Sequence, residues 1–220
     1  MPTSQILSGD SKLYLICDGE TCAARGISLA DFVTGARNGG VKIIQYRHKG
    51  ISAETYAQNL APLVKIASAA GATLIVNDHS GVAEHLRLPL HLGQEDVLPD
   101  KLTVPYGRST HSLAELEIAL SARPAPDYIA LGTMFPSGTK TDVATNRNLV
   151  EQYIRLTDLP LVLIGGITLD NARDLPHSER IFYAVIGDAF RFGATMEGIE
   201  KYAKAWHPHP RPLSRRERGA

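Results

Sequence analysis

Residues 41–49 read VKIIQYRHK, a short apolar run that passes directly into a polar and basic segment. Ile43 and Ile44 are adjacent and do not alternate with polar residues, as expected of parallel strands that are buried on both faces. Runs of this kind recur along the chain and give eight strand candidates, at residues 13–17, 41–46, 73–76, 88–92, 102–106, 128–132, 159–164 and 181–186.

Segments with helical spacing separate many of these runs. Leu29, Phe32, Val33 and Ala36 lie on one face of a helix, and a longer stripe predicts a helix over residues 53–70. Further helical faces follow later in the chain. Ser112, with Glu115 three residues on, has the arrangement of a helix N-cap and capping box.

Eight strands that alternate with helical segments predict an α/β fold, a single-domain TIM (β/α)8 barrel. An open doubly wound sheet is the alternative. The catalytic barrel domain is expected to span residues 1–206. Residues 207–220 are expected to form a disordered basic tail, because they are rich in Pro and Arg.

The bulk composition limits the partners. Lys plus Arg and Asp plus Glu each number 23, and four of the basic residues lie in the tail, so neither nucleic acid nor a membrane is an expected partner. The first twelve residues lack the basic and apolar regions of a secretory signal. Cys17 and Cys22 are expected to be reduced thiols in a cytoplasmic protein. The composition is also compatible with a homo-oligomer of this chain.

Polar residues follow the apolar runs, where a barrel places its functional side chains. Gln45, Arg47 and Lys49 follow or close the second run, and their period of two places them on one side of an extended segment. Arg and Lys suit phosphate contacts. The three residues could therefore bind one anion, or they could be ordinary charges at a solvated strand end.

Two acidic residues follow neighbouring strands. Asp78 comes after the third run and Asp96 after the fourth, and adjacent strands lie about 5 Å apart. Each Asp could cap a following helix. Two carboxylates together could instead share Mg²⁺, which favours one or two carboxylates plus substrate phosphates. With Arg47, Lys49 and Lys140 across the mouth, the pair favours a diphosphate–magnesium site.

Glycines close the last two strands. Gly165, Gly166 and Gly187 could present backbone N–H groups to a phosphate, as barrels commonly do there, or could simply form tight turns. A cationic site with metal and a second site lined by backbone imply two phosphorylated substrates.

The histidines indicate less. His91 lies inside an apolar run and is interpreted as a packed, hydrogen-bonded residue, whereas His48 alternates away from Arg47 and is expected to face outward. His111 is interpreted mainly as a supporting residue, with an acid/base role as the alternative. No serine-hydrolase, P-loop or dinucleotide motif occurs in the sequence.

Six segments in order resemble the thiamine phosphate synthase (thiamine-phosphate pyrophosphorylase) family. They are QYRHK at 45–49, IVND at 75–78, HLGQED at 91–96, GRSTHS at 107–112, DYIALGTMFPSGTKTD at 127–142 and IGGIT at 164–168. The resemblance covers roughly residues 12–203. It implies a transferase of thiamine biosynthesis. The reaction moves hydroxymethylpyrimidine from its diphosphate to the nitrogen of hydroxyethylthiazole phosphate, with Mg²⁺, and releases pyrophosphate.

The resemblance also implies the site residues. Those implied for the pyrimidine diphosphate are Gln45, Tyr46, Arg47, His48, Lys49, Asn77, Ser109 and Lys140. Those implied for the thiazole phosphate are Ser137, Gly138, Thr139, Gly166, Ile186 and Gly187. The implied metal ligands are Asp78 and Asp96. The catalytic roles fall to Arg47, Lys49, Lys140 and Ser109.

Two other functions stay open. A related thiazole tautomerase would use the same barrel with His111 as its candidate residue, but it would lack the Asn-Asp and GQxD elements present here. A non-catalytic phosphate-binding barrel is the other, because Asp188 follows Gly187 and would repel a phosphate if it faced the pocket. Asp188 could instead cap the next helix.

Overall fold

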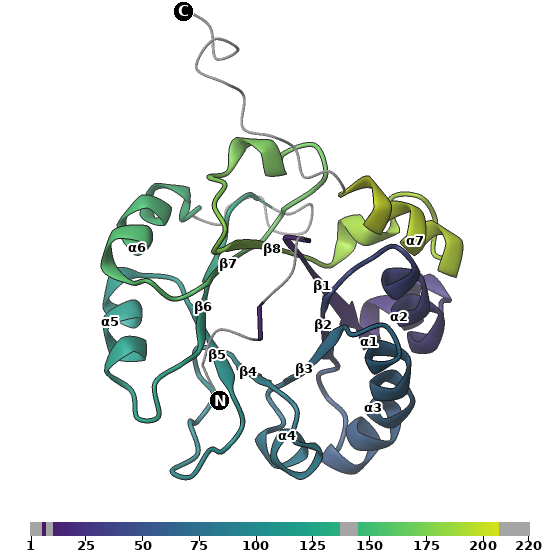
Figure 1. Cartoon of the computed structure of the whole chain (residues 1–220), viewed down its shortest axis with the longest axis horizontal. Coiled ribbons are helices and arrows are strands. Elements are labelled where there is room, and N and C mark those ends of the chain that lie inside the picture. The colour runs from purple at the N-terminus through teal and green to yellow at the C-terminus, as the bar shows by residue number, and fades with distance from the viewer. Residues whose placement is uncertain (1–5, 8–10, 137–144, 207–220) are drawn as a thin grey trace, which may run out of the picture.

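Eight parallel strands form a closed barrel in the order β1 to β8, with β8 paired back to β1 (Figure 1). The structure is a computed structural model, and it describes residues 6–7, 11–136 and 145–206. Closure confirms the TIM-barrel prediction and excludes an open sheet. The strands are β1 Leu13–Asp18, β2 Ile43–Arg47, β3 Thr73–Asn77, β4 Leu90–Leu92, β5 Tyr106–Thr110, β6 Tyr128–Gly132, β7 Leu161–Ile164 and β8 Ile181–Val185.

The helices lie outside the barrel, as Figure 1 shows. They are α1 Gly19–Arg25, α2 Leu29–Asn38, α3 Ala53–Ser68, α4 Ser80–Leu86, α5 Leu113–Ser121, α6 Val150–Leu156 and α7 Met196–Ala205. The ring of helices is incomplete, because residues 93–105 between β4 and β5 contain no helix. The connection from β7 to β8 holds only a short 3-10 helix, Ala172–Asp174.

Alternation along each strand divides the apolar residues into two layers. In β1, Leu13, Leu15 and Cys17 belong to the large layer between barrel and helices. Tyr14 and Ile16 belong to a second cluster inside the barrel. Because both faces of each strand are covered, successive residues of the runs are apolar.

Hydroxyl side chains fix the starts of several helices. Ser52 accepts a hydrogen bond from the backbone N–H of Thr55 at the start of α3, the helix predicted over residues 53–70. Ser112 accepts from Glu115 N at 3.2 Å, as predicted. The carboxylate of Glu115 accepts from the N–H of His111 at 2.7 Å, one residue before the position that a capping box uses.

The prediction for the fifth strand was wrong by four residues. We expected residues 102–106, whereas β5 is Tyr106–Thr110. The polar residues of β5 are compatible with a strand because their side chains form hydrogen bonds. For example, Thr110 Oγ1 donates to Ala130 O. Gly107 leaves room for a ring: a Cβ there would lie 2.0 Å from Cζ of Tyr128. Val104, which suggested a strand, packs in the loop that replaces the missing helix.

Two smaller findings complete the fold. Cys17 and Cys22 are both buried and carry free thiols. Among the described residues, none of the helices combines the length and the apolar character needed to cross a membrane.

Candidate active site

A cavity of about 170 Å³ opens at the carboxyl ends of the strands. Its wall has two chemically distinct sides. One side, from β1 to β5 and the loops after them, carries mostly polar groups, and the other, from β6 to β8, is apolar. The polar side is lined by Tyr14, Gln45, Arg47, Lys49, Asn77, Asp78, His91 and Ser109, and the apolar side by Ala130, Val162, Ile164, Ala184 and Ile186.

The guanidinium of Arg47 is already paired. It forms an ion pair with Asp18, at the end of the neighbouring strand β1, and Asp18 also accepts from Thr21 N at 2.9 Å as the N-cap of α1. Burial alone would raise the pKa of the Asp18 carboxyl, but the hydrogen bonds from Thr21 and the charge of Arg47 lower it. Sequence reasoning missed Asp18, although an Asp that directly follows the first apolar run was the available signal.

The two predicted metal ligands come together. Burial and the adjacent carboxyl of Asp96 together raise the pKa of Asp78 to about 6. The Nζ of Lys49 lies 3.8 Å from Asp78 Oδ2. Asp96 Oδ2 accepts from the N–H of Gly93 at 2.6 Å.

Neither carboxylate serves as a helix cap. The N-cap of α4 is His79, and residues 97–105 between Asp96 and β5 contain no helix. Two adjacent carboxylates repel each other, and one nearby ammonium offsets only part of this repulsion. A divalent cation bound between them would reduce the repulsion further, and carboxylate oxygen atoms suit Mg²⁺. The part of the chain that the structure describes has no group of three or more His, Cys, Asp or Glu suited to a metal. A pair is what Mg²⁺ needs when substrate phosphates and water complete its shell.

Below these charges, five side chains form a hydrogen-bonded chain inside the barrel. Ser109 Oγ lies 2.9 Å from His91 Nε2, and His91 Nδ1 lies 2.9 Å from the hydroxyl of Tyr128. That hydroxyl lies 2.9 Å from the hydroxyl of Tyr14, which accepts from Gln45 Nε2 at 2.8 Å. Burial lowers the pKa of His91 to about 4, so its ring is neutral at physiological pH. The prediction of a packed, hydrogen-bonded His91 is confirmed.

A second cavity, of about 590 Å³, adjoins the first and shares Ile164, Ala184 and Ile186 with it. Gly166 and Gly187 line it. Gly165 and Gly166 have positive φ angles of 101° and 63°. A Cβ at Gly166 would lie 2.4 Å from the carbonyl oxygen of Phe135. The two glycines therefore fit a tight turn at the cavity edge, where backbone faces the ligand space.

Asp188 also lines this second cavity, but its carboxylate is held by several partners. It accepts from Leu169 N at 2.9 Å and from the hydroxyl of Tyr202 at 3.0 Å. Arg191 Nε lies 3.1 Å away and neutralises its charge. Asp188 therefore does not cap α7, which Thr195 caps, and its repulsion of a phosphate is reduced.

Some of the predicted site residues lie elsewhere. Tyr46 is fully buried and packs on Tyr56, with ring centroids 4.5 Å apart, on the helix side of β2. His48 lies 3.1 Å from the hydroxyl of Tyr46 and does not line the cavity, as its predicted outward orientation implied. His111 lies by Glu115 and lines neither cavity. The predicted residues Ser137, Gly138, Thr139 and Lys140 lie outside the described residues.

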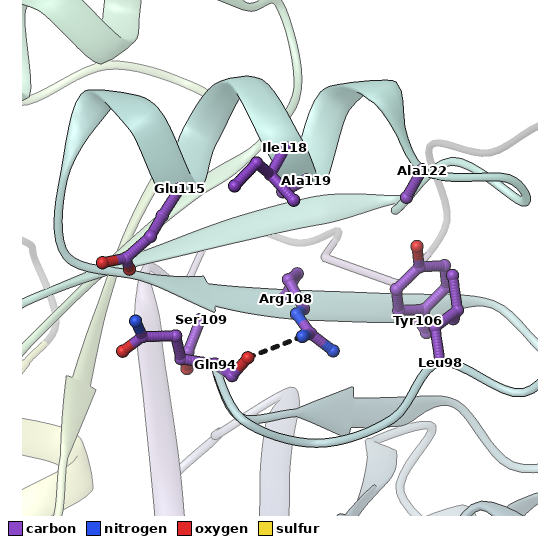
Figure 2. Close-up of a pocket in the computed structure, with 9 residues that line it drawn as sticks. All are labelled: Gln94, Leu98, Tyr106, Arg108, Ser109, Glu115, Ile118, Ala119 and Ala122. Atoms are coloured by element: carbon purple, nitrogen blue, oxygen red, sulfur yellow. Dashed lines mark hydrogen bonds between the residues drawn. The ribbon is translucent and has the colours of Figure 1, made fainter.

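A third cavity, of about 310 Å³, lies outside the barrel where the helix between β4 and β5 is missing. Figure 2 shows Arg108 between the loop that carries Gln94 and helix α5. Its guanidinium donates to the backbone carbonyls of Gln94 and Asp96, each at 2.7 Å. Arg108 thereby supports the loop that positions the Asp96 carboxylate.

The sequence matches a family described as thiamine monophosphate synthase over residues 13–189. Thiamine-phosphate synthase of Enterobacter sp. (strain 638) is 38% identical over an alignment that spans 60% of this chain and 66% of that protein.

Solved structures agree on the fold. Thiamine phosphate pyrophosphorylase from Pyrococcus furiosus superposes with a TM-score of 0.71 at 24% identity, over 89% of this chain and 93% of that chain. The 2-keto-3-deoxy-6-phospho-gluconate aldolase from Zymomonas mobilis has a TM-score of 0.64 at 12% identity, over 92% and 95%. These two proteins are named as different enzymes but share one fold, so the fold alone does not determine the function.

Proposed function

The chain belongs to the thiamine monophosphate synthase family, and we propose on this basis that it is a transferase that makes thiamine phosphate. In the proposed reaction, the bond between the pyrimidine methylene and the diphosphate oxygen breaks, and the electron pair leaves with pyrophosphate. The thiazole nitrogen of hydroxyethylthiazole phosphate then forms the new C–N bond. One observation carries the proposal most strongly: the Asp78–Asp96 pair lies beside cationic groups at one barrel mouth.

The polar side of the first cavity would hold the pyrimidine diphosphate. Arg47 and Lys49 supply positive charge and Asn77 supplies an amide to the departing pyrophosphate, whose negative charge grows as the bond breaks. Ser109 would contact the pyrimidine, and the resemblance adds Lys140 to the cationic groups. The apolar side leaves room for the ring of the second substrate and limits water at the reacting carbon.

Asp78 and Asp96 would hold Mg²⁺. When bound, the ion would act as a Lewis acid and neutralise negative charge on the leaving pyrophosphate. The two carboxylates fit this role because they are adjacent and offer only oxygen atoms. Lys49 lies close enough to Asp78 to contact a phosphate group bound between them.

The second cavity would hold the thiazole phosphate. The backbone at Gly166 and at Gly187 lines it, and Ile186 lies in both cavities. A phosphate bound there would place the thiazole ring toward the first cavity, where the pyrimidine methylene would lie. By the resemblance, Ser137, Gly138 and Thr139 would complete the phosphate site.

Turnover tests the proposal. Pyrophosphate release is measured with both substrates and Mg²⁺. We expect release with the natural chain and a fall of at least about 10²-fold for Asp78→Asn and for Lys140→Ala, the scale for removing one electrostatic group. Asp158→Asn serves as the matched control, because Asp158 is fully exposed before β7, at the opposite end of the strands.

The outcomes separate the alternatives. A thiazole tautomerase would release no pyrophosphate and would depend on His111, and a pure binder would bind both ligands without turnover. Near-normal rates for both Asp78→Asn and Lys140→Ala would contradict the proposed site.

A further inference from the structure

The hydrogen-bonded chain inside the barrel has two ends, and both line the first cavity. Gln45 on β2 forms one end and Ser109 on β5 forms the other. Tyr14, Tyr128 and His91 connect them through four contacts of 2.8 to 2.9 Å. Because each connecting hydroxyl or ring can donate only one hydrogen along the chain, the direction of one bond fixes the direction of the others.

Counting hydrogens from Gln45 gives that direction. The amide nitrogen of Gln45 can only donate, so the hydroxyl of Tyr14 accepts from it. The other partner of the Tyr14 hydroxyl in the described part of the chain is Tyr128, so Tyr14 donates to Tyr128. The hydroxyl hydrogen of Tyr128 then remains for His91 Nδ1.

His91 passes the direction on to Ser109. Because Nδ1 accepts from Tyr128, the neutral ring carries its hydrogen on Nε2, which lies 2.9 Å from Ser109 Oγ. Ser109 therefore accepts from His91. In the part of the chain that the structure describes, Ser109 Oγ has no other partner, so its own hydroxyl hydrogen is left for a group in the first cavity.

We propose that Gln45, Tyr14, Tyr128 and His91 form a one-way hydrogen-bond chain that makes Ser109 a donor toward the cavity. The site then selects a ligand with an acceptor at that place, such as an unprotonated nitrogen of an aromatic ring. A ligand with a C–H or an N–H at the same place is discriminated against. The identity of the ligand rests on the proposed function, whereas the direction of the chain does not.

Burial makes this direction costly to change. Tyr14, Gln45, Tyr128 and His91 are all buried, and a buried hydroxyl or ring nitrogen that loses its partner is destabilising because water cannot replace the lost hydrogen bond. The barrel backbone is also shaped for the chain, because the ring of Tyr128 occupies the space that a side chain at residue 107 would fill. The rings of His91 and Tyr128 stack with centroids 5.7 Å apart, which fixes the orientation of the imidazole.

The direct test is the tautomer of His91 in the full chain. Histidine labelled with ¹⁵N identifies the protonated ring nitrogen by two-bond ¹H–¹⁵N correlations, and His91→Gln assigns the signal by its loss. We expect hydrogen on Nε2 alone. Hydrogen on Nδ1, or on both nitrogens near neutral pH, would overturn the chain direction.

A substitution at the far end should reverse the tautomer. Gln45→Glu replaces the donor by a carboxylate, so Tyr14 would donate to residue 45 and each bond along the chain would turn round, which places the His91 hydrogen on Nδ1. Tyr128→Phe interrupts the chain and should abolish the single tautomer. The matched control is Tyr106→Phe, because the hydroxyl of Tyr106 donates to Pro124 O and takes no part in the hydrogen-bond chain. An unchanged tautomer in both Gln45→Glu and Tyr128→Phe would overturn the proposal.

Binding tests the selection of an acceptor. The probes are 4-amino-5-hydroxymethyl-2-methylpyrimidine and the two analogues in which one ring nitrogen is replaced by C–H. At least one analogue should bind about 10-fold more weakly to the natural chain, and Ser109→Ala should reduce the difference to about 2-fold. Equal binding of all three to the natural chain would overturn the selection. If the His91 hydrogen is on Nε2 but the protein releases no pyrophosphate, the proposed function is refuted. The direction of the hydrogen-bond chain is then still supported.

Discussion

At the scale of single residues, Arg47 reaches the cavity with its charge already balanced by Asp18. The carboxylate of Asp18 is 5% exposed, so it fixes the guanidinium and also starts α1. A diphosphate bound by Arg47 would therefore meet a positioned group. Fixing such a group in advance lowers the cost of ordering it when the ligand binds.

The Asp18–Arg47 pair gives the first prediction. Asp18→Asn should lower the free energy of unfolding by about 2 kcal/mol near neutral pH, because it removes a charged hydrogen-bond partner. The folded state lowers the pKa of Asp18, so its contribution is present above the unfolded value of 3.8 and is lost as the pH falls through the folded pKa. Urea unfolding of both proteins should show the difference shrinking below about pH 3.8. A difference that is constant with pH would contradict this account.

His91 gives the second prediction, because the folded protein holds it neutral, whereas Asp18 is held charged. Its folded pKa of about 4 lies below the ordinary 6.5, so the unfolded chain binds more protons between these values. Stability should fall as the pH falls from 6.5 to 4, by about 3 kcal/mol from this group. We expect the stability of His91→Gln to depend less on pH over that window in urea unfolding. Equal pH dependence of the two proteins would show that His91 is not held neutral.

Sequence reasoning found Arg47, Lys49 and Asp78 but missed the charged Asp18 and the two tyrosines of the hydrogen-bonded chain. Arg47, Lys49 and Asp78 stand out in the sequence because they lie at or just after the end of a buried strand, where a barrel places its functional residues. Tyr14 and Tyr128 do not stand out, because Tyr is a common strand residue and its hydroxyl partners come from distant strands. Their role depends on the closed barrel, which brings β1 and β6 across from each other.

At the scale of elements, the segment between β4 and β5 departs most from the expected pattern. Residues 93–105 are too irregular to cover β5 as a helix would, and Arg108 fills part of the gap (Figure 2). The fifth strand was misplaced because the run at residues 102–106 contains apolar residues, and the buried Val104 among them lies in a loop. Apolar content alone does not separate a buried loop from a strand.

Arg108 gives the third prediction. Arg108→Ala should release the carbonyls of Gln94 and Asp96, so the loop that carries Asp96 becomes less ordered. We expect faster amide hydrogen exchange in residues 94–98 and a several-fold higher Mg²⁺ concentration for half-maximal turnover, with little change at saturating Mg²⁺. Arg123→Ala is the matched control, because Arg123 donates to the carbonyls of Ser121 and Ala122 at the end of α5. The same effect in both variants would show a general loss of stability.

At the scale of the whole molecule, the closed barrel brings residues from distant parts of the sequence to one mouth. The alternation of strands and helices was enough to predict this architecture. The division of the mouth into a polar side, an apolar side and a glycine-lined second cavity depends on which residues face inward at each strand end. That division follows from the register between strands, which sequence patterns do not specify.

The central claim is that this mouth gathers two carboxylates and several cationic groups around one diphosphate. A crystal structure with Mn²⁺ and pyrophosphate tests it most directly, because anomalous scattering locates the ion independently of the phosphate. The account predicts one Mn²⁺ bound by both Asp78 and Asp96, with pyrophosphate against Arg47 and Lys49. An ion bound away from this pair, or pyrophosphate bound only at Gly166 and Gly187, would contradict it.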